Sequence, residues 1–237
     1  MSLNSLLVYK SNYPKIRIGS RNDGGYIIAD GQEYDCLISC GIANDVTFEK
    51  KFLEIYDVPA YAFDGTIDKL PEQVFGLQFI KKNISYFNSD KTTNLIDVIS
   101  QYNNIFLKMD IETFEFRWIQ ILTTQLINKI KQIVIEFHFP FTEPGFTHLD
   151  KPLPPNEKIS VLEKLAQTHT LIHLHGNNCC GVTNYKGITV PNVFECTYLR
   201  KDIQPAQLRS TDPIPSPLDK PNVPGPDIQL TGYPFTV

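Results

Sequence analysis

Short apolar runs alternate along most of the chain with stretches in which apolar residues recur three or four positions apart. The first pattern is typical of buried strands and the second of one face of a helix. The pattern predicts strands at 36–40, 59–63, 77–85, 105–109, 132–137, 171–175 and 193–199. It predicts helices that begin near residues 45 and 93, that span 114–130, and that begin near residue 156.

The predicted strands are almost continuously apolar, as the strands of a parallel sheet covered on both faces must be. We therefore expect an α/β fold, with a mostly parallel sheet and helices on both faces. The last two strands are joined by 176–192, which has no helical pattern and is expected to be a loop. This connection predicts that the last strand returns antiparallel.

The two ends of the chain differ from its middle. Residues 16–30 read as a hairpin with a turn at Asp23-Gly24-Gly25, because glycine tolerates positive φ. Residues 203–237 are rich in proline and cannot form a helix or a central strand. We expect one domain over 1–202, and an extended arm over 203–237 that packs on it through Leu218, Ile228, Leu230 and Phe235.

Composition limits the classes of function. With 237 residues, 42% of them hydrophobic, the chain can bury one sizeable core. A formal charge of -4 argues against a nucleic-acid partner. We find no apolar stretch of membrane-spanning length and no signal peptide. The five cysteines are odd in number and lack CxxC spacing, which favours free thiols and a cytoplasmic location.

Polar, ligand-capable residues follow most of the predicted strands. Ligands of an open parallel sheet bind outside the carboxyl ends of its strands, so these residues form the expected site. An ordinary solvated turn remains the alternative for Asp64, and a plain strand-to-helix turn for Gly41. The strand-end residues are Gly41 and Asn44, Asp64, Asp110 and Glu112, Glu136 and His138, and finally His173 and His175.

Three segments resemble a known family. "LKMDIETFE" (107–115) is similar to the pattern L-K-x-D-h-E-G-x-E of the FkbM-like branch of class I S-adenosylmethionine-dependent methyltransferases. "RIGSRNDGGYII" (17–28) and "HLHGNN" (173–178) also resemble a subgroup of these enzymes. The chain departs from the family at Thr113, where glycine is usual, and in "SCGIAND" (39–45), which lacks a leading acid and a second glycine.

The resemblance, which covers about residues 16–200, implies a Rossmann-like fold and methyl transfer to oxygen, often on sugars or secondary metabolites. It implies a seven-stranded sheet with the last strand antiparallel. The cofactor would be S-adenosyl-L-methionine, and Asp64 would hold its ribose hydroxyls. The expected cofactor-binding residues are Tyr26, Gly41, Asn44, Asp64, Ile84, Ser85 and Asp110.

A sugar hydroxyl is a poor nucleophile near neutral pH and needs a base, a metal ion, or both. The candidate catalytic residues are Asp110, His138 and His175. Asp110, Glu136 and His138 could instead bind a divalent cation such as Mg²⁺ or Mn²⁺. Glu112 is interpreted as a further acid of the site. Glu115 is interpreted as a residue that stabilises the positive end of the next helix.

Two other classes of function stay open. The acids and histidines at the strand ends could serve a metal-dependent hydrolase. The fold could also be a binding module without turnover, whose proline-rich arm docks a partner. The acceptor pocket is expected in 140–155 and 176–192, because loops of such folds vary freely. The sequence indicates neither the acceptor, beyond a small molecule or a glycan, nor the oligomeric state.

Overall fold

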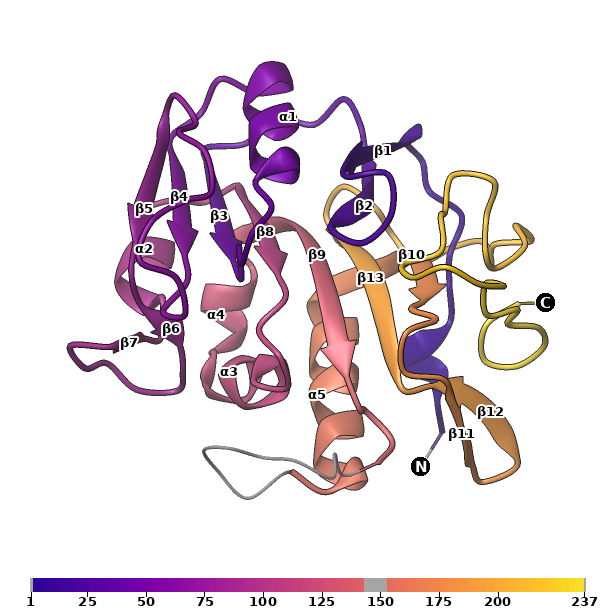
Figure 1. The fold of residues 1–237 in the computed structure, drawn as a ribbon. Coiled ribbons are helices and arrows are strands. Elements are labelled where there is room, and N and C mark those ends of the chain that lie inside the picture. Colours follow the sequence, from indigo (N-terminus) through magenta and orange to yellow (C-terminus); the bar gives the residue numbers. More distant parts are fainter. Residues whose placement is uncertain (1, 143–152, 237) are drawn as a thin grey trace.

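The computed structural model describes residues 2–142 and 153–236. Its central feature is a seven-stranded sheet (Figure 1). In chain order the strands of this sheet are β3 (Cys36–Cys40), β4 (Ala60–Phe63), β5 (Leu77–Ile80), β8 (Ile105–Met109), β9 (Ile130–His138), β10 (His169–Gly176) and β13 (Val193–Arg200). The helices are η1 (Asn4–Leu6), α1 (Thr47–Ile55), α2 (Ile96–Ser100), α3 (Glu115–Ile121), α4 (Thr124–Ile127) and α5 (Pro155–Thr168).

The strands lie side by side in the order β10-β13-β9-β8-β3-β4-β5. Numbered along the chain from β3 as strand 1, and read from the β5 edge, the order is 3-2-1-4-5-7-6. β3 pairs in parallel with β4 and β8, and β8 in parallel with β9. β13 runs antiparallel to both β9 and β10. The mostly parallel sheet with a reversed last strand is therefore confirmed.

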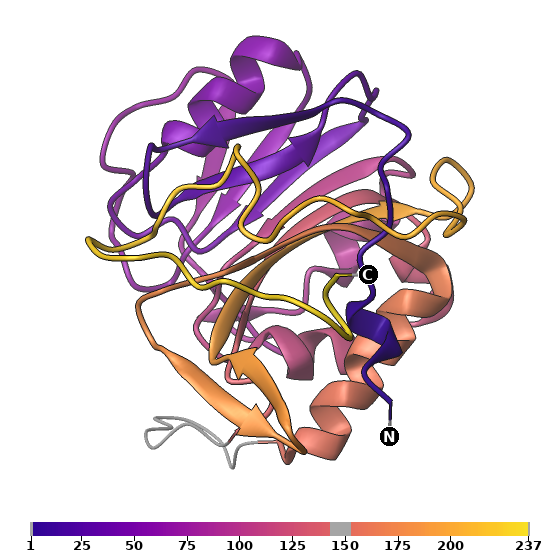
Figure 2. The same cartoon turned by 90° about the vertical axis from the view of Figure 1, so that its right-hand side faces the viewer.

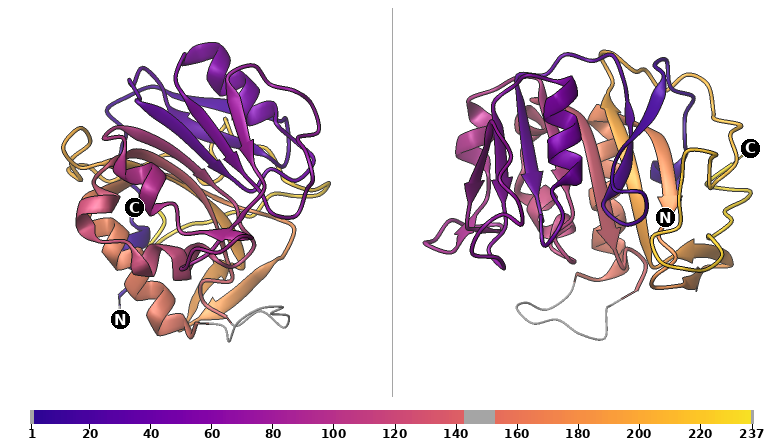
Figure 3. Two further views of the ribbon diagram at one scale, coloured as in Figure 1. Left: turned by 90° about the vertical axis from the view of Figure 1, so that its left-hand side faces the viewer. Right: turned by 45° about the horizontal axis from the view of Figure 1, so that its top comes forward.

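The two faces of the sheet are covered by different elements. Alternate side chains of a strand point to opposite faces. Leu37, Phe106 and Val134 face a core made with α1 and the hairpin of β1 (Lys15–Gly19) and β2 (Gly25–Ala29). Their neighbours Ile38, Leu107 and Ile135 face the larger core made with α3 and α5. Figure 3 shows these two layers on opposite sides of the sheet.

Two predicted elements differ from the structure. The helix expected over 114–130 is split into α3 and α4, because Leu122 has extended backbone (ψ 134) and Thr123 starts a new helix by accepting a hydrogen bond from the amide of Leu126. The loop expected over 176–192 contains a hairpin, β11 (Val182–Tyr185) and β12 (Ile188–Pro191). The strand predicted over 77–85 ends at Ile80, and a short pair, β6 (Asn83–Ile84) and β7 (Thr92–Thr93), follows.

The proline-rich segment 203–236 runs beside β10 and the β1–β2 hairpin (Figure 2). Leu230 and Phe235 are buried in the larger core, and Ile228 packs against that core. Leu218, which was expected to anchor this segment, is 37% exposed. No helix among the described residues is long and apolar enough to cross a bilayer.

Candidate active site at the carboxyl edge of the sheet

The chain makes an unusual turn directly after β8. Glu112 and Thr113 have φ values of 55° and 86°, in the left-handed region that glycine favours. The turn brings the amides of Ile111 and Thr113 to the same carboxylate oxygen, Oε1 of Glu115, at 3.2 and 3.3 Å. Glu115 is the first residue of α3 and is fully buried. The backbone of this turn therefore binds and fixes the buried carboxylate of Glu115.

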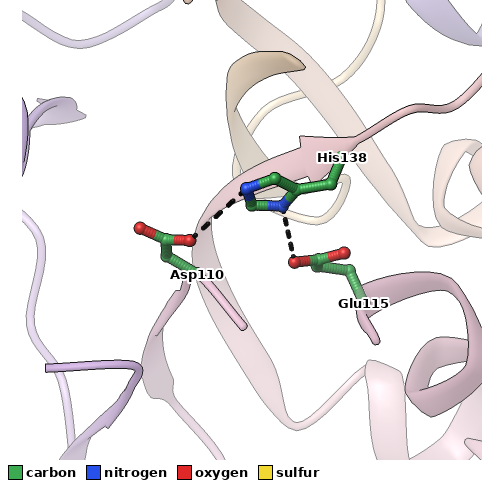
Figure 4. Close-up of side chains that lie close together, drawn as sticks. All are labelled: Asp110, Glu115 and His138. Carbon is green, nitrogen blue, oxygen red and sulfur yellow. Dashed lines mark hydrogen bonds and ion pairs between the residues drawn. The ribbon is translucent and has the colours of Figure 1, made fainter. Parts of the chain in front are cut away.

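His138, the last residue of β9, lies between that carboxylate and three others. Its Nδ1 is 2.9 Å from Oε1 of Glu115. Its Nε2 is 3.4 Å from Glu112, 3.7 Å from Glu136 and 3.9 Å from Asp110. Figure 4 shows the imidazole with Glu115 on one side and Asp110 on the other. Only 6% of His138 is exposed, so these contacts form in a poorly hydrated place.

Residues of neighbouring elements donate hydrogen bonds to two of these carboxylates. The Tyr26 hydroxyl, from β2, donates to Oδ2 of Asp110 at 3.3 Å. The side-chain amide of Asn177, just after β10, donates to Oε1 of Glu136 at 2.9 Å. The other oxygen of Glu136, Oε2, is buried and has no hydrogen-bond partner among the described residues. The hairpin, β8, β9 and the end of β10 thus converge on one cluster.

The charges of this cluster shift the pKa values of its members. Burial by itself would lower the pKa of His138, but the carboxylates of Glu115, Glu136 and Asp110 outweigh it and raise the pKa to about 10. Burial raises the pKa of Glu136 well above its usual value, with Asp110 adding to the effect. The pKa of Glu112 is also raised, by partial desolvation of its carboxyl group and by the nearby charges of Asp110 and Glu115, although 82% of its side chain is exposed. At neutral pH the cluster therefore holds a proton on His138.

His175, the third expected catalytic residue, lies in a different set of contacts. Its Nδ1 is 3.2 Å from Glu195 on β13, and its Nε2 is 3.0 Å from Asp227 in the proline-rich segment. The side chain is completely buried. Since both ring nitrogens already have carboxylate partners, this structure offers no free nitrogen of His175 to an acceptor. His173 also has a carboxylate partner, since its Nε2 lies 2.8 Å from Oδ1 of Asp219.

Asp64, expected to hold the cofactor's ribose, is engaged by the protein itself. Its Oδ2 accepts from the amides of Ile42 and Ala43 at 2.9 and 2.8 Å, and its Oδ1 accepts from the amide and hydroxyl of Thr66 at 2.7 and 2.6 Å. Burial would raise its pKa, but these hydrogen bonds hold the pKa below its usual value. A carboxylate has about four acceptor positions, so none is left over.

The other expected cofactor residues are spread along the same edge. Gly41 (φ 81) packs so closely on β8 that a Cβ would lie 1.7 Å from the carbonyl oxygen of Asp110, which explains the glycine without a ligand. Ile84 is part of the larger core, and Ser85 is also buried. Asn44 is exposed and lines a hollow of about 520 Å³ beside α1, together with Lys50.

The predicted metal ligands Asp110, Glu136 and His138 are brought together. Asp110, Glu115 and His138 also offer ligand atoms within 4.8 Å of one another. Glu115, however, faces Nδ1 of the imidazole, whereas Asp110 and Glu136 face Nε2. One cation cannot use both nitrogens of one ring, so Glu115 is better suited to orient the ring than to bind the ion.

Two parts of this site were not predicted from the sequence. Glu115 was assigned to the helix end only, although it also pairs with His138. Asn177 was not assigned a role, although it lies two residues beyond His175 in "HLHGNN" and holds Glu136. The period of two along β10 could have placed Asn177 on the face of His175, but nothing in the sequence indicated that Glu136 would be its partner.

Comparison of the chain with models of known protein families and with curated proteins finds no match. Among solved structures, it is similar to a protein from Thermoplasma acidophilum that is described provisionally as a methyltransferase. The two share 11% identity over 70% of this chain and 68% of that one, with a TM-score of 0.34. A similarity this low carries no argument about activity.

Proposed function

We propose that the protein is an S-adenosylmethionine-dependent methyltransferase that transfers a methyl group to a hydroxyl of a sugar, a glycan or another small hydroxylated molecule. The observation that carries the proposal is the sheet: seven strands, of which only the last in the chain is reversed, as the resemblance of "LKMDIETFE" implies. The carboxyl edge of that sheet holds the His138 cluster, where a hydroxyl could be activated.

S-adenosylmethionine would supply the electrophilic methyl group, and the protein would orient the acceptor and handle its proton. In this proposal Asp110 and His138 act together on the acceptor hydroxyl. His138 holds a proton at neutral pH, so it can act as a base only after that proton has left. The Tyr26 hydroxyl, bonded to Asp110, fixes the carboxylate that faces the acceptor.

The cofactor would bind at the ends of β3 and β4, near Gly41 and Asp64. Because Asp64 has no acceptor position left over, ribose binding there has to exchange some of its present hydrogen bonds. We propose that the amides of Ile42 and Ala43 are released and then face the cofactor. These two amides should therefore change their rate of hydrogen exchange when S-adenosylhomocysteine binds, whereas the amide of Thr66 should change less.

Calorimetry and thermal unfolding of the full chain with S-adenosylmethionine test the proposal. At a ligand concentration 100 times Kd, binding stabilises the folded state by about 2.7 kcal/mol, which raises the Tm of a domain of this size by about 5–10 °C. Asp64→Ala should weaken binding, whereas Asp57→Ala, at an exposed position, should not. Absence of both heat and Tm shift at millimolar cofactor would overturn the proposal.

A metal-dependent hydrolase is the second candidate, and one observation favours it. The expected ribose carboxylate is occupied by the protein's own amides, whereas the cluster around His138 is assembled. A hydrolase of this kind would bind a divalent cation tightly and show no response to S-adenosylmethionine. The calorimetric experiment therefore separates the two candidates.

A further inference from the structure

We propose that the protein binds one divalent cation through Nε2 of His138 and the carboxylates of Asp110, Glu112 and Glu136, with Glu115 as the residue that positions the imidazole. This adds Glu112 to the metal ligands expected from the sequence. The inference deepens the proposed methyl transfer and rests on it for the role of the ion, but the site itself stands on geometry alone.

The distances from Nε2 of His138 to the three carboxylates suit ligands of one metal ion better than direct hydrogen bonds. The three carboxylates lie 3.4, 3.7 and 3.9 Å from one nitrogen, and the last two distances are too long for a hydrogen bond. Metal–ligand bonds are about 2.0–2.3 Å, so two ligands of one ion at 90–120° lie about 3–4 Å apart. To share one ion with Nε2, the three carboxylates would have to turn toward this nitrogen and toward one another.

Glu136 provides an independent reason to expect a ligand. It is only 4% exposed, and its Oε2 has no hydrogen-bond partner among the described residues. Its Oε1 is held by Asn177 at 2.9 Å, so the carboxylate is fixed rather than free to turn toward water. The oxygen of Glu136 that lies 3.7 Å from Nε2 of His138 is Oε1. A buried carboxylate oxygen without a partner costs free energy, and a cation bound by both oxygens of Glu136 would offset that cost.

Glu115 completes the arrangement that histidine ligands of metal ions usually have. Such a histidine donates its other ring N–H to a carboxylate, which fixes the tautomer and the orientation of the ring. Nδ1 of His138 lies 2.9 Å from Oε1 of Glu115, and that oxygen is itself fixed by the amides of Ile111 and Thr113. A cation that displaces the proton of Nε2 and leaves the proton on Nδ1 would meet a lone pair that points toward Asp110, Glu112 and Glu136.

The ligand types indicate which ion the site would take. Three carboxylates and one imidazole suit Mn²⁺ or a similar hard cation, whereas a dedicated Mg²⁺ site would rely on oxygen ligands and water. Glu112 is 82% exposed at its side chain, so it can move onto or off the ion and leave a coordination position open. An acceptor hydroxyl bound at that position would lose its proton more readily.

Titration of the EDTA-treated full chain with MnCl₂, followed by the electron paramagnetic resonance signal of free Mn²⁺, tests the inference. We expect one site per chain. Glu136→Gln keeps the size and the Asn177 contact but removes the charge, and should weaken binding at least about tenfold. Glu163→Gln, at an exposed position of α5, serves as the control and should bind as the unmodified chain does.

Absence of Mn²⁺ binding at millimolar concentration, or equal affinity in Glu136→Gln and the control, would overturn the site. Each variant is first checked by thermal unfolding, so that a misfolded chain is not counted, and Glu112→Gln provides a second test at an exposed position. Calorimetry with S-adenosylmethionine is measured separately. If the chain binds Mn²⁺ but does not bind S-adenosylmethionine, the proposed methyl transfer is wrong and the metal site stands. If methyl transfer persists in EDTA, the proposed role of the ion in the reaction is wrong.

Discussion

Replacement of Glu115 by glutamine should change the titration of His138 more than its position. Glutamine keeps the shape of the side chain and a carbonyl oxygen for the amides of Ile111 and Thr113, but it removes the charge that lies 2.9 Å from Nδ1. Glu115 is the strongest of the carboxylates that raise the pKa of His138 to about 10. Without it, burial should draw the pKa back toward the value of a free imidazole.

The magnitude follows from the kind of contact that is lost. A hydrogen bond to a charged group contributes about 1.5–3 kcal/mol, and about 1.4 kcal/mol corresponds to one pH unit. The pKa of His138 should therefore fall from about 10 to about 8–9 in Glu115→Gln. The raised pKa stabilises the folded state fully below about pH 6.5, and this stabilisation is lost as the pH rises through about 10.

Nuclear magnetic resonance of the imidazole signals against pH, in EDTA-treated protein, measures this directly. His138→Gln assigns the signal, and Glu163→Gln is the matched control on the exposed face of α5. Two results would contradict this prediction: a pKa of His138 near 6.5 in the chain without substitutions, or the same pKa of His138 in that chain and in Glu115→Gln. The stability of Glu115→Gln should also depend less on pH between about 6.5 and 10.

Three further predictions concern the backbone and the proline-rich segment. Thr113→Gly should stabilise the fold by about 1 kcal/mol, or about 2–4 °C in Tm, because φ is 86° at this residue; thermal unfolding measures this. Gly41→Ala should lower the free energy of unfolding by about 3 kcal/mol, because the new Cβ would meet the carbonyl oxygen of Asp110; urea unfolding measures this. The pKa of His175 is raised to about 9, so its charged pairing with Asp227 is fully present below about pH 6.5 and is lost as the pH rises through 9. Limited proteolysis near Asp227 should therefore be faster at pH 9.5 than at pH 6.5.

The fold was largely predictable because its strands carry a strong local signal. "CLISC" is mostly apolar and lies between Asp35 and the glycine turn at Gly41, and β3 spans the predicted 36–40. The helix predicted over 114–130 failed because the break at Leu122 and Thr123 has no glycine or proline to indicate it. Apolar residues continue at helical spacing across that break, so periodicity alone cannot detect it.

The candidate site was predictable in its location but not in its contacts. Strand ends of a parallel sheet meet at one edge, which is sufficient to bring Asp110, Glu136 and His138 together. One of the two carboxylate partners of His175, Asp227, lies 52 residues further along in a segment without periodicity, so the burial of His175 could not be anticipated. The hydrogen bonds of Asp64 come partly from backbone amides, which no residue type indicates.

A crystal structure with S-adenosylhomocysteine bound tests the central claim most directly. We expect the ligand at the ends of β3 and β4, with its ribose at Asp64 and its sulfur facing the cluster of His138. A ligand bound elsewhere on the molecule, or crystals that bind none at saturating concentration while Asp64 keeps the amides of Ile42 and Ala43, would contradict it.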